Sequence, residues 1–250
     1  MDILSLDMAA FVIGAAFLAG FVDSIAGGGG LVTIPALLIA GLDPITAIGT
    51  NKLQGLFGSG SASLAYARRG HVSPREVGAA ALISFAGAVL GALLALVMPL
   101  DLLEAALPFL LVAIALFFAF KPGLSDKDAE RRISPAAFAL FVVPLIGAYD
   151  GLFGPGTGSF FMLAFVTLAG YGILRATAHT KILNFASNCG GFLVFAAFGS
   201  ILWKVGLAMG LAQFLGARLG ASLAMRLGAG LIRPLLVIVC LALATKLLFF

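Results

Sequence analysis

Apolar runs recur along the whole chain, and each is near or above the ~18 residues that a membrane-spanning helix needs. Three of them cover Val77–Met98, Leu102–Phe120 and Leu235–Phe250. The chain is 62% hydrophobic and 10% charged over 250 residues, whereas a soluble domain carries roughly 25% charged residues. We therefore predict an all-α integral membrane protein with no room for a separate soluble domain.

The first apolar run is expected to be a retained helix. Asp2 and Asp7 precede it, and no basic segment or small-residue cleavage site is present, so the pattern is not that of a removable signal peptide.

Glycine clusters divide the apolar sequence into long and short helices. In the first half we expect helices at 8–25, 31–41, 45–67, 74–98 and 101–120. The hydrophilic stretch 121–134 carries four basic and three acidic residues, and the same order of elements returns after it. This order predicts two membrane repeats, 1–120 and 135–250, joined by a cytoplasmic connector at 121–134. Together the repeats contain about 7–10 membrane helices or half-helices, some of them broken by glycine.

The two halves match in register. Gly20-Phe-Val-Asp23 aligns with Gly147-Ala-Tyr-Asp150, which places the Gly27–Gly30 cluster on Gly154–Gly158. Farther along, an offset of 129 residues places Lys52 on Lys181. The same offset pairs Asn51 with Thr180, Ser59 with Asn188, Gly70 with Gly199, Gly87 with Gly216, and Gly91 with Gly220. Such a run of matches predicts an internal duplication.

Loop charges predict that the two repeats have opposite orientations. Arg68, Arg69 and Arg75 mark one loop of the first half as cytoplasmic, while Asp101 marks the opposite side. In the second half the equivalent of the arginine loop is nearly uncharged, and the basic residues flank the turn that corresponds to Asp101. Inverted-topology repeats of this kind are typical of secondary transporters.

Each glycine cluster precedes a helix of ~10–12 residues, which is too short to span a membrane alone. Non-helical backbone at membrane depth is buried in protein or lines a wet cavity, and helix N-termini attract anions. We therefore predict an anion site near the bilayer midplane, built from both clusters. Its expected members are Gly27, Gly28, Gly29, Gly30 and Thr33, with Gly154, Gly156, Thr157, Gly158 and Ser159. The alternative is a packing role, because glycines let membrane helices approach closely.

A polar stripe follows each cluster, about 10 Å into the third helix of the half. A lysine at that depth is costly unless it faces a polar cavity or a partner. The residues expected to bind the anion here are Thr50, Asn51 and Lys52, and His179, Thr180, Lys181, Asn184 and Asn188. Thr180, Asn184 and Asn188 lie four residues apart and form one polar stripe, as Asn51, Gly55 and Ser59 do in the first half, and we expect these stripes to close the same cavity. Two alternatives stay open: the lysines could snorkel to the interface, and His179 could be a structural histidine.

Only Asp23 and Asp150, of eleven acidic residues, lie embedded in the apolar sequence. A cavity with two lysines and so few carboxylates favours a small anion over a metal cation. No metal site and no cofactor are therefore expected. Asp23 and Asp150 could pair with the lysines, cap the glycine loops or carry a coupling proton, and the sequence does not rank these roles.

Three segments carry a resemblance to a known family: Gly27-Gly-Gly-Gly-Leu-Val-Thr-Ile-Pro35, Ala47-Ile-Gly-Thr-Asn-Lys52, and the degenerate second copy from Gly147 through Lys181. The chain resembles the TauE/SafE family of anion permeases over nearly its whole length. The resemblance implies a multi-pass carrier of the bacterial inner membrane for sulfite or an organosulfonate such as sulfoacetate. The second copy departs from the first at Pro155, Thr157 and His179, so equal roles of the two halves do not follow.

Other classes of function are weighed against this one. An enzyme would need a nucleophile with a base, or a metal cluster, and no such constellation stands out, so no catalytic residue is expected. The basic residues are scattered among apolar helices, so the expected partners are a small anion and the lipid bilayer rather than nucleic acid. An anion channel, or a permease for a different small solute, is the alternative to an alternating-access carrier. The sequence gives no oligomeric state.

Overall fold

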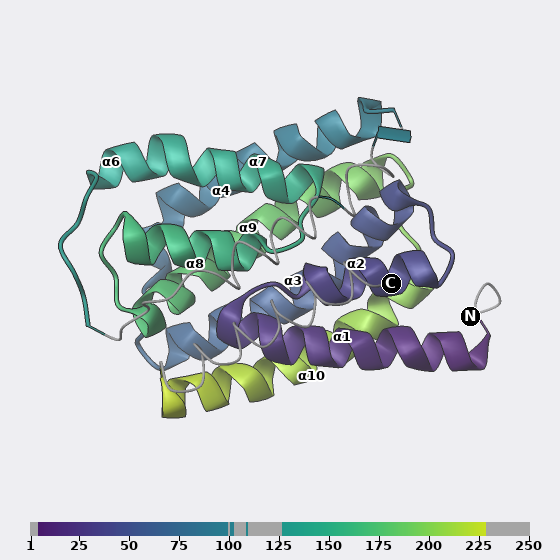
Figure 1. Ribbon diagram of the computed structural model, residues 1–250, viewed down its shortest axis with the longest axis horizontal. Helices are drawn as coiled ribbons and strands as arrows, with labels where there is room; N and C mark the ends of the chain where they lie inside the picture. The colour runs from purple at the N-terminus through teal and green to yellow at the C-terminus, as the bar shows by residue number, and fades with distance from the viewer. Residues whose placement is uncertain (1–4, 100, 103–108, 110–126, 229–250) are drawn as a thin grey trace.

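The computed structural model describes residues 5–99, 101–102, 109 and 127–228, and Figure 1 draws the rest as a thin grey trace. Within the described ranges the protein consists of helices and short connections, with no strand. This confirms the predicted all-α class. The helices expected at 101–120 and 235–250 lie almost entirely outside the described residues.

The described helices of the first half agree with the predicted ranges to within two residues at each end. Asp43 caps one of them, because its Oδ1 accepts a hydrogen bond from the Thr46 N–H at 3.0 Å. These helices are α1 (Leu6–Ala26), α2 (Gly30–Ile39), α3 (Pro44–Arg68) and α4 (Pro74–Val97).

The second half repeats this order of long, short, long and long helices. Its first helix is built in three pieces and contains a π-helical turn directly before Pro144, which has no N–H to donate. The elements are α6 (Pro135–Ala137), η1 (Phe138–Val142), α7 (Val143–Leu152), α8 (Thr157–Thr167), α9 (Ile173–Ala197) and α10 (Trp203–Leu227).

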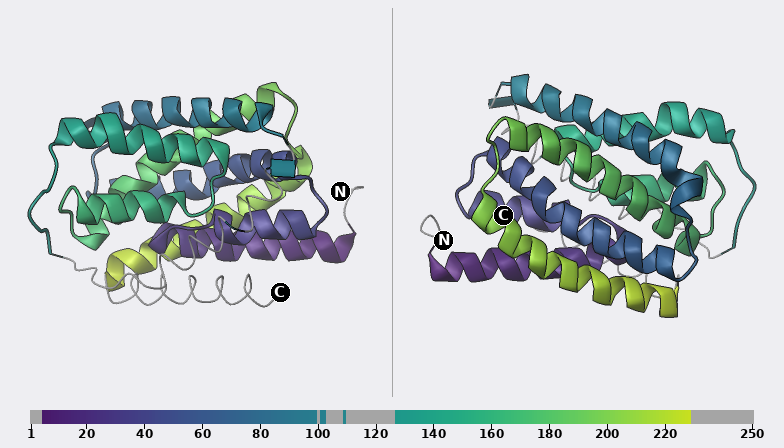
Figure 2. Two further views of the ribbon diagram at one scale, coloured as in Figure 1. Left: turned by 45° about the horizontal axis from the view of Figure 1, so that its top comes forward. Right: turned by 180° about the vertical axis from the view of Figure 1, so that it is seen from behind.

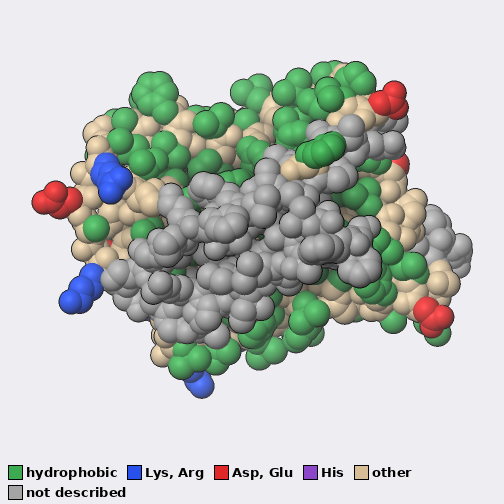
Figure 3. All heavy atoms as spheres, viewed as in Figure 1, with side chains coloured by type: hydrophobic (Ala, Val, Ile, Leu, Met, Phe, Trp, Pro, Cys, Tyr) green, Lys and Arg blue, Asp and Glu red, His purple; other side chains and the backbone are tan. Residues whose placement is uncertain are grey.

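Hydropathy separates an outer set of helices from a central pair. Four described helices are long and apolar enough to cross a membrane: Leu6–Ala26, Arg75–Val97, Pro135–Leu152 and Trp203–Leu227. On the face in Figure 3 the described charged side chains lie mostly toward the two ends, and described hydrophobic side chains gather along the upper and lower margins. The central pair, α3 and α9, is as long but is not among the helices apolar enough to qualify as spans, and the two helices pack against each other.

The packing of the two halves is reciprocal. Helix α1 packs on α10, whereas its counterpart α7 packs on α4, and α3 and α9 contact α10 and α4 in the same exchanged manner. Figures 1 and 2 show these pairs side by side from three directions. Each half therefore completes its packing with helices of the other half.

Glycines allow close backbone contact in two of these helix pairs, and aligned residues make the contact in both halves. A Cβ added at Gly91 of α4 would overlap the backbone carbonyl of Ala148 in α7. A Cβ added at Gly220 of α10 would overlap the carbonyl of Phe21 in α1. Gly91 and Ala148 align with Gly220 and Phe21 in the predicted duplication, so the aligned residues make the same contact.

Corresponding helices run in opposite directions. The end of α3 and the start of α9 line one hollow, which contains Gly70 and Arg175. At the far end, Thr50 near the start of α3 accepts a hydrogen bond at 3.0 Å from the N–H of Leu202, which follows α9. Helix α3 therefore runs antiparallel to α9, and the same holds for α1 and α7 in Figure 1.

Candidate functional site

The two glycine breaks contact each other inside the bundle. The backbone of Gly27 and Gly28 ends α1 with φ values of 81° and 90°, and Gly154 and Gly156 follow α7 with φ values of 91° and 79°. Such angles favour glycine because it has no Cβ. A side chain at Gly27 would also collide with the first turn of α8. Glycine is therefore needed in the breaks both for backbone conformation and for their close approach.

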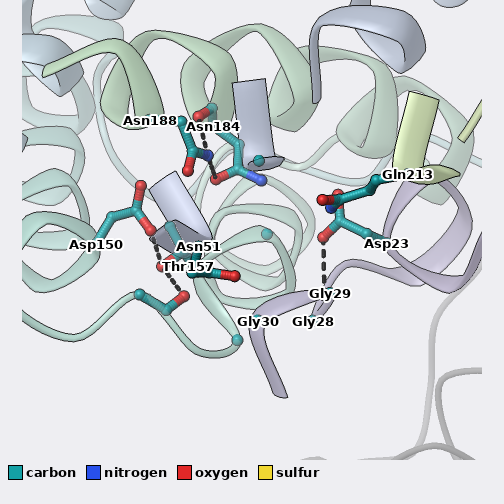
Figure 4. Close-up of a pocket in the computed structure, with 14 residues that line it drawn as sticks. Asp23, Gly28, Gly29, Gly30, Asn51, Asp150, Thr157, Asn184, Asn188 and Gln213 are labelled. Atoms are coloured by element: carbon teal, nitrogen blue, oxygen red, sulfur yellow. Dashed lines mark hydrogen bonds between the residues drawn. The ribbon is translucent and has the colours of Figure 1, made fainter. Parts of the chain in front are cut away.

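A small buried cavity lies where the breaks meet. Its volume is about 30 Å³, two to three times the space that one water molecule needs. Both short helices begin at this cavity, as Figure 4 shows for the first of them. The lining residues come from both halves: Asp23, Gly28, Gly29, Gly30, Asn51, Gly55, Asp150, Gly154, Gly156, Thr157, Gly158, Asn184, Asn188 and Gln213.

Two buried ion pairs stand beside the cavity, and each joins one half of the chain to the other. Lys52 Nζ lies 2.8 Å from Asp150 Oδ1, and Lys181 Nζ lies 3.1 Å from Asp23 Oδ2. Both lysine side chains are fully buried. Snorkelling is therefore excluded. The four charges also cancel, so the cavity wall carries no net charge from them.

The aspartates also cap the glycine breaks. Each aspartate therefore has both structural roles that the sequence left open, pairing with a lysine and capping a glycine loop. Asp23 Oδ1 accepts a hydrogen bond from the Gly29 N–H at 3.1 Å (Figure 4). Asp150 Oδ1 lies 2.7 Å from the hydroxyl of Thr157, at the start of α8. Each carboxylate thus holds the start of its own short helix while it pairs with a lysine of the other half.

The two aspartates differ in one respect. Both oxygens of Asp23 have partners, Gly29 and Lys181. In Asp150, by contrast, Oδ1 accepts the hydrogen bonds of both Lys52 and Thr157, and the buried Oδ2 has no hydrogen-bond partner. A buried acceptor without a partner is costly unless a solute, water or proton occupies it. The two halves are therefore chemically unequal at this point.

Amide side chains complete the cavity wall. Asn184 and Asn188 lie one helical turn apart on α9, and the Asn188 amide donates to the Asn184 backbone carbonyl at 2.7 Å. Asn51 of α3 accepts from Gln54 at 2.9 Å. In Figure 4 Gln213 lies beside Asp23, across the cavity from Asp150. Its Oε1 is buried and has no partner.

Twelve of the residues predicted from sequence line this cavity, counting both aspartates. The others lie outside the lining for identifiable reasons. Thr50 holds the Leu202 backbone, Thr33 contacts the Asn51 side chain, and Ser159 holds the Ala26 carbonyl. The residues outside the lining are Gly27, Thr33, Thr50, Lys52, Ser159, His179, Thr180 and Lys181.

The positions of the lysines and the histidine differ from the expectation. Lys52 and Lys181 were expected to face the cavity, but the carboxylates face it and the ammonium groups lie behind them, because each is drawn into its ion pair. His179 lies at another hollow near the end of the bundle. Its ring packs against Phe165 and Tyr171, and its Nδ1 lies 2.9 Å from the Arg175 carbonyl.

The sequence analysis missed Gln213, and it placed Gly55 on the first stripe without naming it as a binding residue. Gln213 is a polar residue in the middle of α10, a helix apolar enough to span a membrane, and that contrast is the signal that could have identified it. Gly55 leaves room for Asn188, because a Cβ there would lie 2.6 Å from the Asn188 Oδ1.

Comparison with known proteins identifies the family of the chain. A family model described as "Sulfite exporter TauE/SafE" matches residues 12–247. The chain belongs to the TauE/SafE family. The resemblance stated from the glycine and lysine motifs is thereby confirmed.

The relatives that this TauE/SafE chain matches are described as transporters, and the match covers most of their length. "Probable membrane transporter protein ORF9" of a Sinorhizobium species is 64% identical over 248 residues, covering 99% of this chain and 95% of that protein. "Probable membrane transporter protein YfcA" of Escherichia coli K12 is 47% identical, covering 94% and 87%. A Haemophilus influenzae protein, also named a probable membrane transporter protein, is 46% identical, covering 100% and 97%.

No solved structure matches this TauE/SafE chain. Family and relatives are described as transporters rather than enzymes, and four described helices are suited to span a membrane. The chain is accordingly a multi-pass membrane transporter of the TauE/SafE family.

Proposed function

We propose that the protein carries a small anion, sulfite or an organosulfonate such as sulfoacetate, and binds it in the central cavity. The observation that carries the proposal is the convergence of two glycine-preceded helix starts, at α2 and α8, on one buried cavity. The first-turn N–H groups of a helix lack intrahelical partners and attract negative charge. The small volume and the family description as a sulfite exporter agree with a compact oxyanion.

The two carboxylates in the wall do not oppose an anion, because each is neutralised by a lysine within 3.1 Å. A solute entering the cavity lies beside the glycines at the starts of the two short helices and beside the amides of Asn51, Asn188 and Gln213. Amide side chains both donate and accept hydrogen bonds. The cavity therefore offers donors to oxyanion oxygens without a net negative field from its ion pairs.

Alternating access between two inverted repeats is the mechanism that we assign to this site. Three observations support it: corresponding helices run in opposite directions, their packing partners are exchanged, and each ion pair joins the two halves. In carriers with inverted repeats the solute site lies at the repeat interface, and one unit rocks against the other. The repeats comprise 1–120 and 135–250, and the connector at 121–134 faces the cytoplasm. The bacterial relatives support placement in the inner membrane.

Asp150 is the residue that we assign to proton coupling. Its Oδ2 is buried at the cavity wall without a hydrogen-bond partner, so it is free to accept a proton from the solvent or from a protonated oxyanion. Proton uptake there also weakens the pair with Lys52. Asp23 lacks such an open oxygen and remains a structural acid in this scheme.

Counterflow in proteoliposomes tests the proposal. Vesicles preloaded with unlabelled sulfite should accumulate radiolabelled sulfite transiently, with saturation, because a carrier exchanges solute across its site. Sulfoacetate, sulfate and taurine in place of the preloaded anion rank the candidate solutes. Flux that neither saturates nor shows counterflow would identify an anion channel instead, and absence of flux for every anion would contradict anion transport.

A pair of variants on one helix localises the site. Asn188→Leu replaces a polar part of the cavity wall with an apolar side chain, and we expect it to lower anion affinity about tenfold or more, because a desolvated anion then loses a polar neighbour. Thr180→Val is the matched control. Thr180 is buried two turns away on the same stripe, its hydroxyl has no partner, and it does not line the cavity.

A further inference from the structure

A hollow separate from the central cavity lies between α3 and α10 at the end of α3. Its volume is about 270 Å³. Three arginines line it, Arg68, Arg69 and Arg218, together with apolar side chains that include Leu64 and Phe214. No acidic residue is among its lining. A basic head region is thus combined with an apolar wall.

The three guanidinium groups have no counter-ion in the described part of the chain. The ion pairs there involve Lys52, Lys181 and Arg175, and none involves the arginines of this hollow. The single hydrogen bond is long, from Arg69 to the Ser222 hydroxyl at 3.5 Å. Three like charges around one hollow repel one another, and an anion placed among them relieves that repulsion.

The position of the hollow identifies the medium that surrounds it. Arg218 lies inside α10, within a helix long and apolar enough to span a membrane, nine residues before its end at Leu227. At 1.5 Å per residue this is about 14 Å from the end of the helix. An arginine there must reach toward the interface or find a partner. Leu215 and Leu219 on the same helix are 57% exposed, as expected of side chains that face acyl chains.

We propose that this α3–α10 hollow binds the headgroup phosphate of an anionic phospholipid, with the acyl chains along the apolar wall. Arginine suits this role, because its planar donors bind phosphate oxygens in pairs. Basic pockets between membrane helices are a known mode of lipid recognition. A free oxyanion would satisfy the charges but not the apolar wall. The proposal is independent of the solute that the central cavity carries.

The test uses the purified full-length protein in neutral detergent. Phosphatidylglycerol should raise the melting temperature of the wild type more than the same amount of phosphatidylcholine does. The triple variant Arg68→Gln, Arg69→Gln, Arg218→Gln should bind phosphatidylglycerol roughly 100-fold more weakly by titration, because each basic residue at a membrane surface contributes about fivefold. These side chains are exposed, so the variant should still fold, which its melting temperature without lipid verifies.

A variant with the same loss of charge serves as the control. Arg75→Gln, Arg131→Gln, Arg226→Gln removes three exposed arginines that do not line the hollow, and it should keep the wild-type lipid affinity. Equal weakening in both triple variants would mean attraction by net charge alone and would overturn the proposal. Unchanged affinity in the first triple variant would overturn it as well. A shift of the same size with inorganic phosphate or sulfate would identify a free-anion site instead of a lipid site.

Discussion

Lys52 and Lys181 are buried ammonium groups that the fold tolerates because an aspartate of the opposite half meets each of them. Neither lysine side chain is exposed, and the N–O distances are 2.8 and 3.1 Å. Removing one member of a buried ion pair leaves the other charge desolvated and uncompensated, which costs about 3–5 kcal/mol. The ion pairs therefore contribute to the stability of the protein and also form part of its site.

Lys52→Met tests this role at the level of single residues. We expect it to destabilise the protein by about 3 kcal/mol or more, because Asp150 stays buried without its partner. Adding Asp150→Asn should restore at least half of that loss, since the double variant has no unpaired charge. Unfolding by heat or denaturing detergent measures both effects. If Lys52→Met alone melts like the wild type, the pair is not structurally important.

Asp150→Asn and Asp23→Asn form a matched pair for the coupling hypothesis, because each leaves one lysine beside a neutral amide. Asp150→Asn should abolish anion uptake driven by a pH gradient and spare anion exchange at equal pH, since exchange moves no net proton. Asp23→Asn should keep both activities. Proteoliposome uptake measures them. If both variants keep gradient-driven uptake, neither acid carries a proton. If only Asp23→Asn loses gradient-driven uptake, the coupling residue is Asp23 and the assignment to Asp150 is wrong.

Among the helices, the distance between neighbours is set by glycines that pack directly against the backbone of the next helix. In α4, Gly91 faces the backbone of α7 so closely that a methyl group has no room, whereas Gly78 on the same helix has nothing within 4 Å of an added Cβ. The contact of Gly220 in α10 is equivalent. These positions explain why the interior of a bundle so rich in leucine and phenylalanine depends on glycine.

Gly91→Ala should therefore destabilise the protein by about 1–3 kcal/mol, the usual range for an overpacked interior. Gly78→Ala is the control, and it should be neutral or slightly stabilising because alanine favours helix. Thermal melting of the two variants compares them directly. Equal melting temperatures would show that α4 and α7 can separate without cost.

Backbone hydrogen bonds and the side chain of Asp128 join the segment before α6 to the loop between α8 and α9. The Asp128 carboxylate accepts the Gly172 N–H at 2.6 Å and pairs with Arg175 at 2.9 Å, and these contacts lower the pKa of Asp128 below its ordinary value. Because the folded pKa is lowered, the stabilisation is present above the unfolded pKa of about 3.9 and is lost as pH falls through the folded value.

Asp128→Asn should thus lower the melting temperature slightly at neutral pH. The effect should be under about 1 kcal/mol, because the pair is exposed. The difference from the wild type should shrink as the pH falls below about 4 and vanish when Asp128 is protonated in both states. A melting series against pH measures it. A difference that persists at the lowest pH would mean that charge is not what holds the connector.

At the scale of the whole molecule, much of the architecture follows from local sequence. The helix ranges and the glycine breaks depend on hydropathy and glycine clusters, which are properties of neighbouring residues, and the predicted duplication depends on the register of regularly spaced residues. Twelve of the predicted residues line one cavity because the breaks fix where the short helices begin. The exchange of α4 and α10 between the halves is a tertiary property, and no local pattern reveals it.

Side-chain direction was the part that sequence could not supply. Lys52 and Asn51 are adjacent on α3, but the helix turns one toward Asp150 and the other into the cavity. His179 lies close to Lys181 in sequence and yet belongs to a different hollow. Gln213 enters the site from a helix that has no glycine break at all.

We propose that the cavity between the glycine breaks is a solute site that opens to each side of the membrane in turn. One cysteine tests it: Asn188→Cys in a protein whose Cys189 and Cys240 are replaced by alanine. A membrane-impermeant thiol reagent should modify this cysteine in right-side-out vesicles and in inverted vesicles, and the transported anion, at a concentration raised to offset the weaker binding of an Asn188 variant, should slow both reactions. Modification from one side only, or at a rate that the anion leaves unchanged, would contradict the account.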